Sequence, residues 1–411
     1  MRLLKLSCCF LFAALLARPD NTDDAGVLGN VDMKNANFSL EASDLAWQRG
    51  QVRVPITRAF NSRSLFQGMF GFGWCSNLET VLKQDGDEWV LKVCGDGAEL
   101  RFCPKAQQEW TSALNGVIRR ESGKLIYTDE KGEVTEFAED GHMLSLHRPT
   151  ACKLDLEYED GLLRSVRACG VPWFSIRYSG NGKIKEIRTF EGRSIYYQTG
   201  IGGALLSVRD GEMTLCRYEY DQLNNLTYLY QPSKKPGSPD EARLTYDVNR
   251  DWLVRFRAGA CEEQYTYLPE PKTSDRYSSH VKRICNGRVE QDFQMRLWYG
   301  STISGCKSTN RPRDYLARSE LIERTFLRTK TIEEIGNPQF DTLLQSRTQD
   351  GEKTVFIYDQ SGNLLRTDVY GKNGTLIKTE RSSGSKTAGV NARNCNFCSS
   401  SRDPVTGITG Q

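Results

Sequence analysis

The sequence is poor in histidine, and its charges are almost balanced. Only three histidines occur among 411 residues: His142, His147 and His280. Lysine and arginine number 55 against 52 aspartates and glutamates. The chain therefore lacks the charge excess that attracts nucleic acid or an anionic membrane surface. This balance excludes nucleic-acid binding, and the shortage of histidine leaves few groups for acid–base or zinc chemistry near neutral pH.

A long apolar run is also missing. The longest stretch, Leu6 to Ala17, has 12 residues and follows a short basic start. Crossing a bilayer core takes about 20 residues, so the pattern predicts a cleaved secretory signal over residues 1–17 and no transmembrane segment. A lipoprotein carrying lipid on Cys8 or Cys9 is the alternative, although both stand at the start of the run. We expect a secreted or envelope protein.

Motifs for catalysis are scarce. No G-x-S-x-G occurs, and the glycine-rich stretches 71–74 and 200–203 lack the lysine and the following helix of a phosphate-binding loop. A bulge or a tight sheet corner explains both stretches. His142 and His147 stand near a predicted strand end, where turn or surface roles are expected. We predict no catalytic residue, cofactor or metal. A secreted carbohydrate-active hydrolase stays as the remotest alternative, because paired carboxylates cannot be recognised by sequence spacing.

Cysteines are plentiful, and eleven follow the signal segment. In an oxidising compartment several should pair, and an odd count leaves at least one unpaired. Cys94 and Cys103 flank the strand-like run 98–102 and are the first candidate pair. Cys395 and Cys398 have the C-x-x-C spacing of redox and zinc sites. Because no second C-x-x-C follows, a local disulfide or two tail thiols is the preferred interpretation.

What the sequence does contain is a β pattern. Short runs of alternating apolar and polar residues, such as Leu154 to Tyr158, recur along residues 36–265. Turn pairs such as Asp160-Gly161 and Asn181-Gly182 separate them every 8 to 12 residues. Asp-Gly and Asn-Gly favour the positive φ angles of tight hairpins. The pattern predicts an all-β chain of consecutive antiparallel hairpins. Only residues 314–335 have helical composition, and one helix is expected there.

An internal repeat runs through this β pattern. Its units begin with a tyrosine, often followed by aspartate, and recur about every 20 residues. They begin at Tyr158, Tyr178, Tyr197, Tyr220, Tyr246 and Tyr358. A hairpin of this length cannot bury its own apolar face, so neighbouring units must stack. We expect the tyrosine to fill the inner face and the aspartate to open the polar turn.

The repeat resembles the YD-repeat, or RHS (rearrangement hot spot), family. Its clearest copy contains Tyr358, Asp359, Gly362 and Asn363. Upstream residues resemble the module that precedes the repeats in bacterial RHS proteins: Arg58, Asn61, Ser62, Gly71, Gly73, Trp74, Asp96 and Gly97. We expect Trp74 to anchor the start of the sheet. Arg58, Asn61 and Ser62 should form a hydrogen-bonded corner that fixes strand register.

The resemblance implies a β strip that curves into a full or partial shell. It divides the chain into a signal (1–17), a linker (18–35), the N-terminal module (36–150), repeats (151–267), an unfamiliar region with one helix (268–345), further repeats (346–380) and a flexible tail (381–411). No self-cleaving core or toxin domain is recognisable, so neither activity is carried over from the family.

The functional expectation is a non-enzymatic scaffold that presents a surface to carbohydrate or to a protein. Exposed aromatic residues could stack on sugars, whereas buried ones would form the inner face of the strip. The alternative function is an orphan shell component of a polymorphic-toxin or contact-dependent system. In that case the partners would be other RHS chains or a toxin.

Overall fold

The computed structural model is almost entirely β. It describes residues 30–33, 36–49, 52–94, 99–112, 115–148, 152–232, 240–269, 276–300, 315–325, 328–339, 343–360 and 362–382. These residues form 33 strands and one short 3-10 helix, η1 (Asn77–Glu79). Within those ranges no helix has the length and apolarity that crossing a bilayer requires. The predicted all-β class is confirmed.

The first strands form a small antiparallel sheet of their own. Its order is β1 (Asn30–Asp32), β2 (Asn37–Arg49), β3 (Val52–Asn61) and β6 (Trp74–Ser76). Between β3 and β6 the chain makes a minimal pair of strands, β4 (Gln67–Gly68) and β5 (Gly71–Phe72). We call the four-stranded unit the N-terminal sheet.

A second sheet contains the remaining 27 strands, and we call it the strip. Its first strands are β7 (Val81–Asp85), β8 (Glu88–Lys92), β9 (Glu99–Ala106), β10 (Glu109–Ser112), β11 (Gly116–Glu121), β12 (Lys124–Thr128), β13 (Val134–Ala138), β14 (Met143–His147), β15 (Lys153–Glu159), β16 (Leu162–Ala168), β17 (Val171–Tyr178), β18 (Ile184–Thr189), β19 (Ser194–Thr199) and β20 (Leu205–Asp210). It continues through β21 (Met213–Tyr220), β22 (Leu226–Tyr230), β23 (Glu241–Tyr246), β24 (Leu253–Ala258), β25 (Cys261–Pro269), β26 (Arg276–Cys285), β27 (Arg288–Gly300), β28 (Tyr315–Thr325), β29 (Thr329–Gly336), β30 (Leu344–Gln349), β31 (Glu352–Tyr358), β32 (Leu364–Tyr370) and β33 (Leu376–Arg381).

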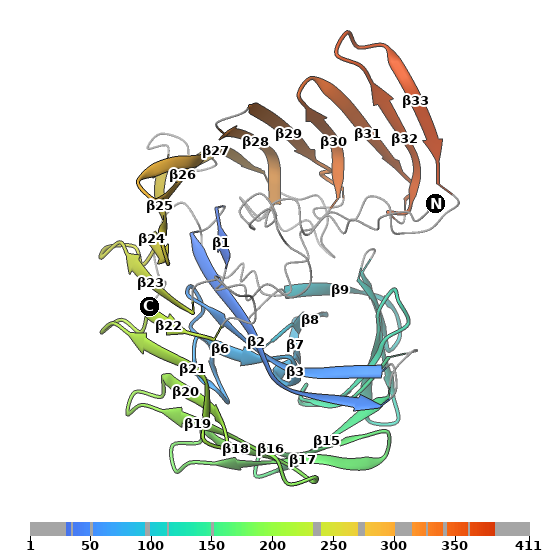
Figure 1. The fold of residues 1–411 in the computed structure, drawn as a ribbon. Helices are drawn as coiled ribbons and strands as arrows, with labels where there is room; N and C mark the ends of the chain where they lie inside the picture. The colour runs from blue at the N-terminus through green and yellow to red at the C-terminus, as the bar shows by residue number, and fades with distance from the viewer. Residues whose placement is uncertain are drawn as a thin grey trace.

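Each strand of the strip pairs with the next strand in the sequence, always antiparallel. The strip curves around β2 and β3, and its last strands extend away from its first ones (Figure 1). It is not closed. The expectation of a curved strip of successive hairpins is confirmed.

The turns explain why the strands pair in sequence order. Asp160 and Gly161 have φ angles of 53° and 73°, and a tight hairpin with this backbone twist suits the right-handed twist of paired strands. The glycine has a positive φ in the Xaa-Gly turns at Gly86, Gly132, Gly141, Gly161, Gly182, Gly192 and Gly211. Local turn chemistry therefore selects the nearest neighbour as pairing partner.

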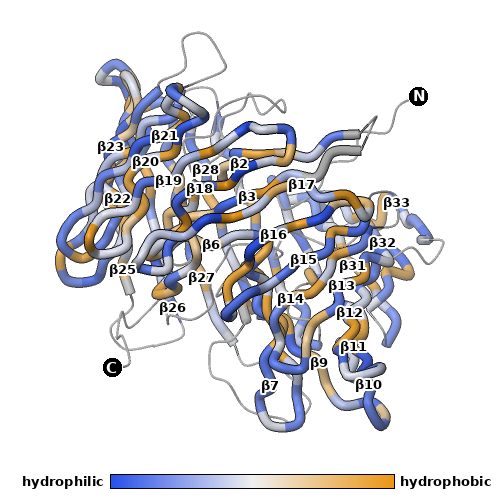
Figure 2. The backbone as a smooth tube through the Cα atoms, turned by 90° about the horizontal axis from the view of Figure 1, so that it is seen from below, coloured by the Kyte–Doolittle hydropathy of each residue, from blue (hydrophilic) through white to orange (hydrophobic). Residues whose placement is uncertain are grey.

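Alternation then decides which face is buried. In β23, Ala242, Leu244 and Tyr246 are buried and the residues between them are exposed. Hydrophobic and hydrophilic residues alternate along the strip in Figure 2. The buried side chains of the strip and of the N-terminal sheet form one hydrophobic core. Phe38 of β2, for example, stacks on Phe256 of β24 with ring centroids 5.9 Å apart.

The helix expected within residues 314–335 is wrong. The described part of this stretch forms strands β28 and β29, whose register pairs Leu321 with Ile332. The apolar residues of this stretch follow the spacing of a helix only in part, so the local preference for a helix is weak. Pairing with β27 and β30 overrides it. The region without recognisable repeats thus continues the strip.

Candidate functional site: the junction of the N-terminal sheet and the strip

The most unusual chemistry of the chain lies where the N-terminal sheet meets the inner face of the strip. Asp44 is the extra residue of a bulge in β2, between the pairs Ser43–Thr57 and Leu45–Ile56. Its carboxylate receives two hydrogen bonds from Arg58 of β3, from Nε to Oδ2 at 2.6 Å and from Nη2 to Oδ1 at 3.1 Å. Arg58 is fully buried. The result is a two-point ion pair inside the core.

The strip completes the coordination of this pair. Tyr197 of β19 donates its hydroxyl to Asp44 Oδ2 at 3.2 Å. Arg58 Nη1 donates to Tyr218 Oη at 2.9 Å, and Nη2 contacts Cys216 Sγ at 3.3 Å. The Arg58 guanidinium also lies 4.7 Å from the centroid of the Trp74 ring. Every one of these partners lies on β2, β6 or on consecutive repeat hairpins of the strip.

The electrostatics of the junction favour a fixed ion pair. Burial is the largest single effect and opposes the charge of Arg58, but Asp44, Tyr218 and Cys216 together outweigh it and raise the pKa of Arg58 well above its ordinary value. Burial, and then the charge of Asp44, raise the pKa of Tyr197. Burial likewise raises the pKa of Tyr218. The tyrosines therefore stay neutral donors and acceptors, and the junction holds the two sheets together.

A glycine loop makes the second contact between the two sheets. Met69 O accepts a hydrogen bond from Ile184 N of β18 at 2.9 Å, and Lys183 Nζ donates to Gly68 O at 3.1 Å. Gly71 has a φ of 116°, and a Cβ there would lie 2.2 Å from Gly203 O. Glycine is required at this position both by the backbone angle and by the close approach of the strip.

Glu79 holds this glycine loop in place through hydrogen bonds to its backbone. Its carboxylate accepts hydrogen bonds from Met69 N at 2.6 Å and Ser76 N at 2.8 Å. Ser76 in turn caps η1, so the two residues form a capping box. Burial raises the pKa of Glu79 to about 7, although the two N–H groups and nearby Lys183 work in the opposite direction.

The predicted corner residues lie in two places. Ser62 Oγ accepts a hydrogen bond from Phe38 N at 2.9 Å, and Asn61 Oδ1 accepts one from Arg63 N at 3.0 Å. Asn61 N also donates to Gly73 O. Asn61 and Ser62 thus belong to a corner beside β2, whereas Arg58 reaches into the strip. Sequence reasoning grouped the three but did not identify Asp44, Tyr197 or Tyr218 as partners of Arg58.

The repeat motif has a common geometry. The pairing register shifts just before Tyr178, Tyr220 and Tyr358, because the strand that follows each of them has one extra residue at that point. Each hydroxyl donates to a backbone carbonyl near the start of the preceding strand: Tyr178 to Leu163, Tyr220 to Leu205 and Tyr358 to Leu344. The motif tyrosine thereby ties one strand to the one before it.

The aspartate of the motif closes the turn. Asp359 Oδ1 accepts from Asn363 N at 2.8 Å, and Oδ2 accepts from Asn363 Nδ2 at 2.8 Å. Asp221 and Asn225 repeat this arrangement. Gly362 has a φ of 81° in the same turn. Such side-chain hydrogen bonds mimic those of a backbone turn. The motif residues therefore stabilise the turn between two strands.

The proposed disulfide between Cys94 and Cys103 is wrong. Cys94 pairs with Cys75, and Cys103 is bonded to a different cysteine. Cys94 has a φ of 55° and packs with Cys75 and Ala59, which are paired residues of β6 and β3, so its thiol lies against the N-terminal sheet. Two further disulfides join Cys152 to Cys169 and Cys261 to Cys285. Among the described cysteines, Cys216 is free and buried.

Several predictions concern residues outside the described ranges. They are the signal over 1–17, most of the linker over 18–35, the Asp96-Gly97 turn, and nearly all of the tail over 381–411 with its pair Cys395–Cys398.

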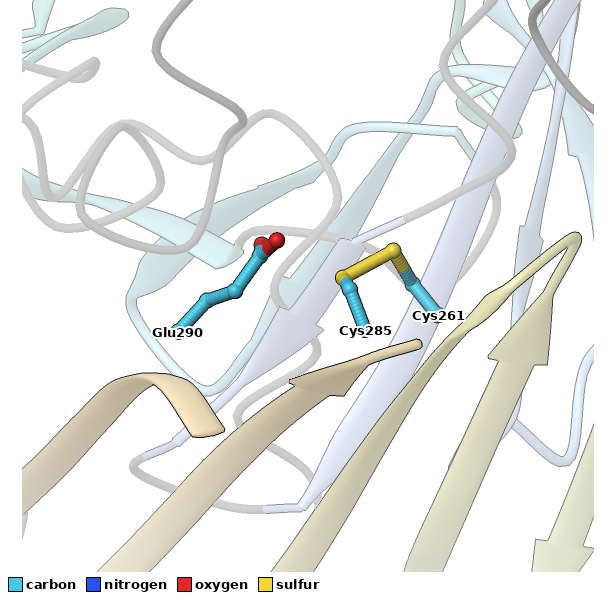
Figure 3. Close-up of side chains that lie close together, drawn as sticks. All are labelled: Cys261, Cys285 and Glu290. Atoms are coloured by element: carbon cyan, nitrogen blue, oxygen red, sulfur yellow. A yellow bond between two sulfur atoms is a disulfide. The ribbon is translucent and has the colours of Figure 1, made fainter. Parts of the chain in front are cut away.

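One cluster has the composition of a metal site. Cys261, Cys285 and Glu290 place their ligand atoms within 4.8 Å of one another. Figure 3 shows the two sulfurs joined to each other with the Glu290 carboxylate beside them. A disulfide sulfur is not the thiolate that metal ions bind. In this state the cluster is therefore a cross-strand disulfide beside an acidic side chain.

The contacts of His142 and His280 are not those of a hydrolytic triad. His142 Nδ1 faces Asp140, and its ring lies 4.6 Å from that of Tyr158. His280 Nε2 lies 2.8 Å from Asp292 Oδ1. A triad also needs a nucleophile within reach of the imidazole, and neither pair of contacts includes one.

Six of the seven tryptophans belong to the core or pack against it. Trp74, Trp89, Trp173 and Trp252 are buried, and Trp47 and Trp110 pack against the core. Trp298 lies under the Arg318 guanidinium, 4.7 Å from its ring centroid. This placement agrees with the interpretation of the aromatic residues as the inner face.

Sequence comparison relates only a short part of this chain to a known family. A family model described as a domain of unknown function, DUF6531, matches residues 29–102, which contain the N-terminal sheet and the first strands of the strip. No match was found among curated proteins. The chain is similar to crystal structures of TcdB2-TccC3-Cdc42 (TM-score 0.30, 10% identity) and of TcdB2-TccC3 without its hypervariable C-terminal region (TM-score 0.29, 11% identity). In both, 84% of this chain aligns with 24% of the longer one. The chain thus spans about a quarter of the length of the structures it matches.

Proposed function

We propose that this chain is an exported, non-enzymatic β scaffold of the YD/RHS type. The strip forms a curved wall, and the N-terminal sheet braces its inner side. The observation that carries the proposal is the junction of Asp44, Arg58 and Tyr218, which fastens the two sheets through fully buried polar contacts. A buried ion pair fixes one relative placement of the elements it joins, because displacement would leave a charge unpaired in the core.

The disulfides support export. Three are formed between described residues, Cys75–Cys94, Cys152–Cys169 and Cys261–Cys285. Disulfides persist in oxidising compartments and are rare in the cytosol. The wall would therefore act in the envelope or outside the cell.

The partner that fits best is a protein. Carbohydrate recognition by stacking needs a group of exposed aromatic rings. Six of the seven tryptophans are buried or pack against the core, and the large exposed aromatic side chains are Phe190 and Tyr196. The second candidate function is a shell component of a toxin system. The curvature of the strip favours it, and so does β33, which among the described strands pairs only with β32, because a partner chain could extend the wall there.

A pull-down with the purified chain from a culture of its own producer tests both functions, with mass spectrometry of what is retained. We expect a protein in stoichiometric amount. A small cytotoxic protein shielded from added protease would support the shell, and a protease-accessible surface protein would support the scaffold. Binding to a glycan array without any retained protein, or turnover of a polysaccharide by the purified chain, would overturn the proposal.

A further inference from the structure

Within the described ranges, β33 is the last strand of the strip and one of its two edges has no pairing partner. It pairs with β32 on one side, and all six of its residues are exposed. Leu376 and Ile377 keep 55% and 62% of their surface accessible. At the other end of the strip, Val81 of β7 forms a bridge with His142. An edge with free backbone groups is a template for a further strand.

The hydrogen bonds of β33 show which backbone groups face outward. Ser382 N donates to Leu365 O of β32. Because strand residues alternate, the N–H groups of Glu380 and Lys378 also point toward β32. Thr379 and Arg381 therefore direct their N–H and C=O groups away from the strip.

We propose that β33 pairs antiparallel with β33 of a second copy of this chain, about a two-fold axis at Thr379. Thr379 then faces Thr379 of the other copy in a hydrogen-bonded pair, which uses the outward groups of both strands. The same register places Lys378 opposite Glu380, twice. Opposite charges across a strand pair stabilise it, and like charges destabilise it. The charge pattern of β33 is thus complementary to itself.

This self-complementarity is the reason to name a second copy as the occupant. A closed two-fold contact uses the same patch on both chains, and the order Lys378, Thr379, Glu380 meets that condition. The dimer would join two strips into one continuous sheet. One strand pair buries less surface than a standard interface, so we expect association that depends on protein concentration.

Disulfide trapping tests the register. In the purified full chain, Thr379→Cys should form a covalent dimer, because facing residues of a hydrogen-bonded pair are about 5.5 Å apart at Cα. Arg381→Cys is the matched control on the same strand. Its two copies would lie four residues apart along the pair, about 13 Å, and should not cross-link above the wild-type background. Equal cross-linking of both variants, or none with Thr379→Cys, would overturn the register.

Charge reversal tests the contact by sedimentation equilibrium. Lys378→Glu and Glu380→Lys should each weaken dimerisation about ten-fold, because each places like charges opposite one another twice. The double variant restores both pairs and should return the dissociation constant to within about two-fold of wild type. A chain that stays monomeric at all concentrations, or a dimer that none of the variants changes, contradicts the proposal. Neither result bears on the scaffold function itself.

Discussion

Trp74 and Tyr220 are joined by a hydrogen bond that links the N-terminal sheet to the repeats. The indole Nε1 of Trp74 donates to Tyr220 Oη at 2.9 Å, and Tyr220 donates onward to Leu205 O at 2.9 Å. One hydroxyl therefore serves two motifs that lie 146 residues apart in the sequence.

Replacing Tyr220 by Phe should lower the free energy of unfolding by about 1–3 kcal/mol, since the buried indole N–H and the Leu205 carbonyl both lose their partner. Urea denaturation measures this change. Tyr196→Phe is the control, because Tyr196 is 37% exposed and its variant should stay within about 0.5 kcal/mol of wild type. Similar losses in both variants would contradict the role of Tyr220.

Removing one member of the Arg58–Asp44 pair should be costly. Arg58→Met leaves the Asp44 carboxylate buried without its counter-charge. Asp44→Leu leaves the Arg58 guanidinium buried without its counter-charge. Each should destabilise the chain by about 3–5 kcal/mol. The double variant removes both charges, so its loss should be smaller than the sum of the two. A double-mutant cycle measured by chemical denaturation tests this prediction. If the losses of the two single variants add up to the loss of the double variant, the two side chains are not coupled.

Glu79 should make stability depend on pH. Its folded pKa of about 7 lies above the ordinary value of 4.5. The folded chain therefore binds this proton more tightly than the unfolded chain does. Stability from this group is complete below about pH 4.5 and is lost as pH rises through 7. We expect a decline of roughly 2 to 3 kcal/mol at most between pH 5 and 8.

Glu79→Gln should flatten that decline, because the amide does not ionise. The amide of the Glu79→Gln variant has one acceptor oxygen and cannot accept hydrogen bonds from both Met69 N and Ser76 N. The lost hydrogen bond lowers the stability of the variant whatever the pH, so its stability at one pH does not report on ionisation. The informative quantity is the difference between wild type and variant across pH, followed by thermal or urea unfolding. A constant difference from pH 5 to 8 would exclude Glu79 as the titrating group.

Removing the Cys261–Cys285 disulfide should lower the stability of the chain, whereas adding or removing a metal ion should not change it. Cys261→Ala with Cys285→Ala should cost about 2–4 kcal/mol, as expected for removal of a constraint on the unfolded chain. Adding Zn²⁺ or a chelator to the oxidised protein should leave the Tm unchanged. Glu290→Gln serves as the control, since it should be neutral unless a metal is bound. A chelator-dependent drop in Tm would identify a metal centre instead.

The local structure of this protein was predictable because local rules govern it. Turn pairs such as Asp160-Gly161 specify tight hairpins, and alternation in segments such as β23 specifies the buried face. Both signals lie within a few residues. The expected helix failed for the opposite reason: the local signals in the stretch that forms β28 and β29 are weak, and pairing between strands overrides them.

The amino-acid sequence alone determined an all-β chain of successive antiparallel hairpins, and it marked the tyrosines, aspartates and glycines of the turns. Only the tertiary structure decided that Asp44, Arg58 and Tyr218 meet, that Cys94 pairs with Cys75, and that β33 is left exposed. These relationships depend on how far a twisted strip curves before the N-terminal sheet packs against it. That curvature is summed over many strands, so no single segment of sequence encodes it.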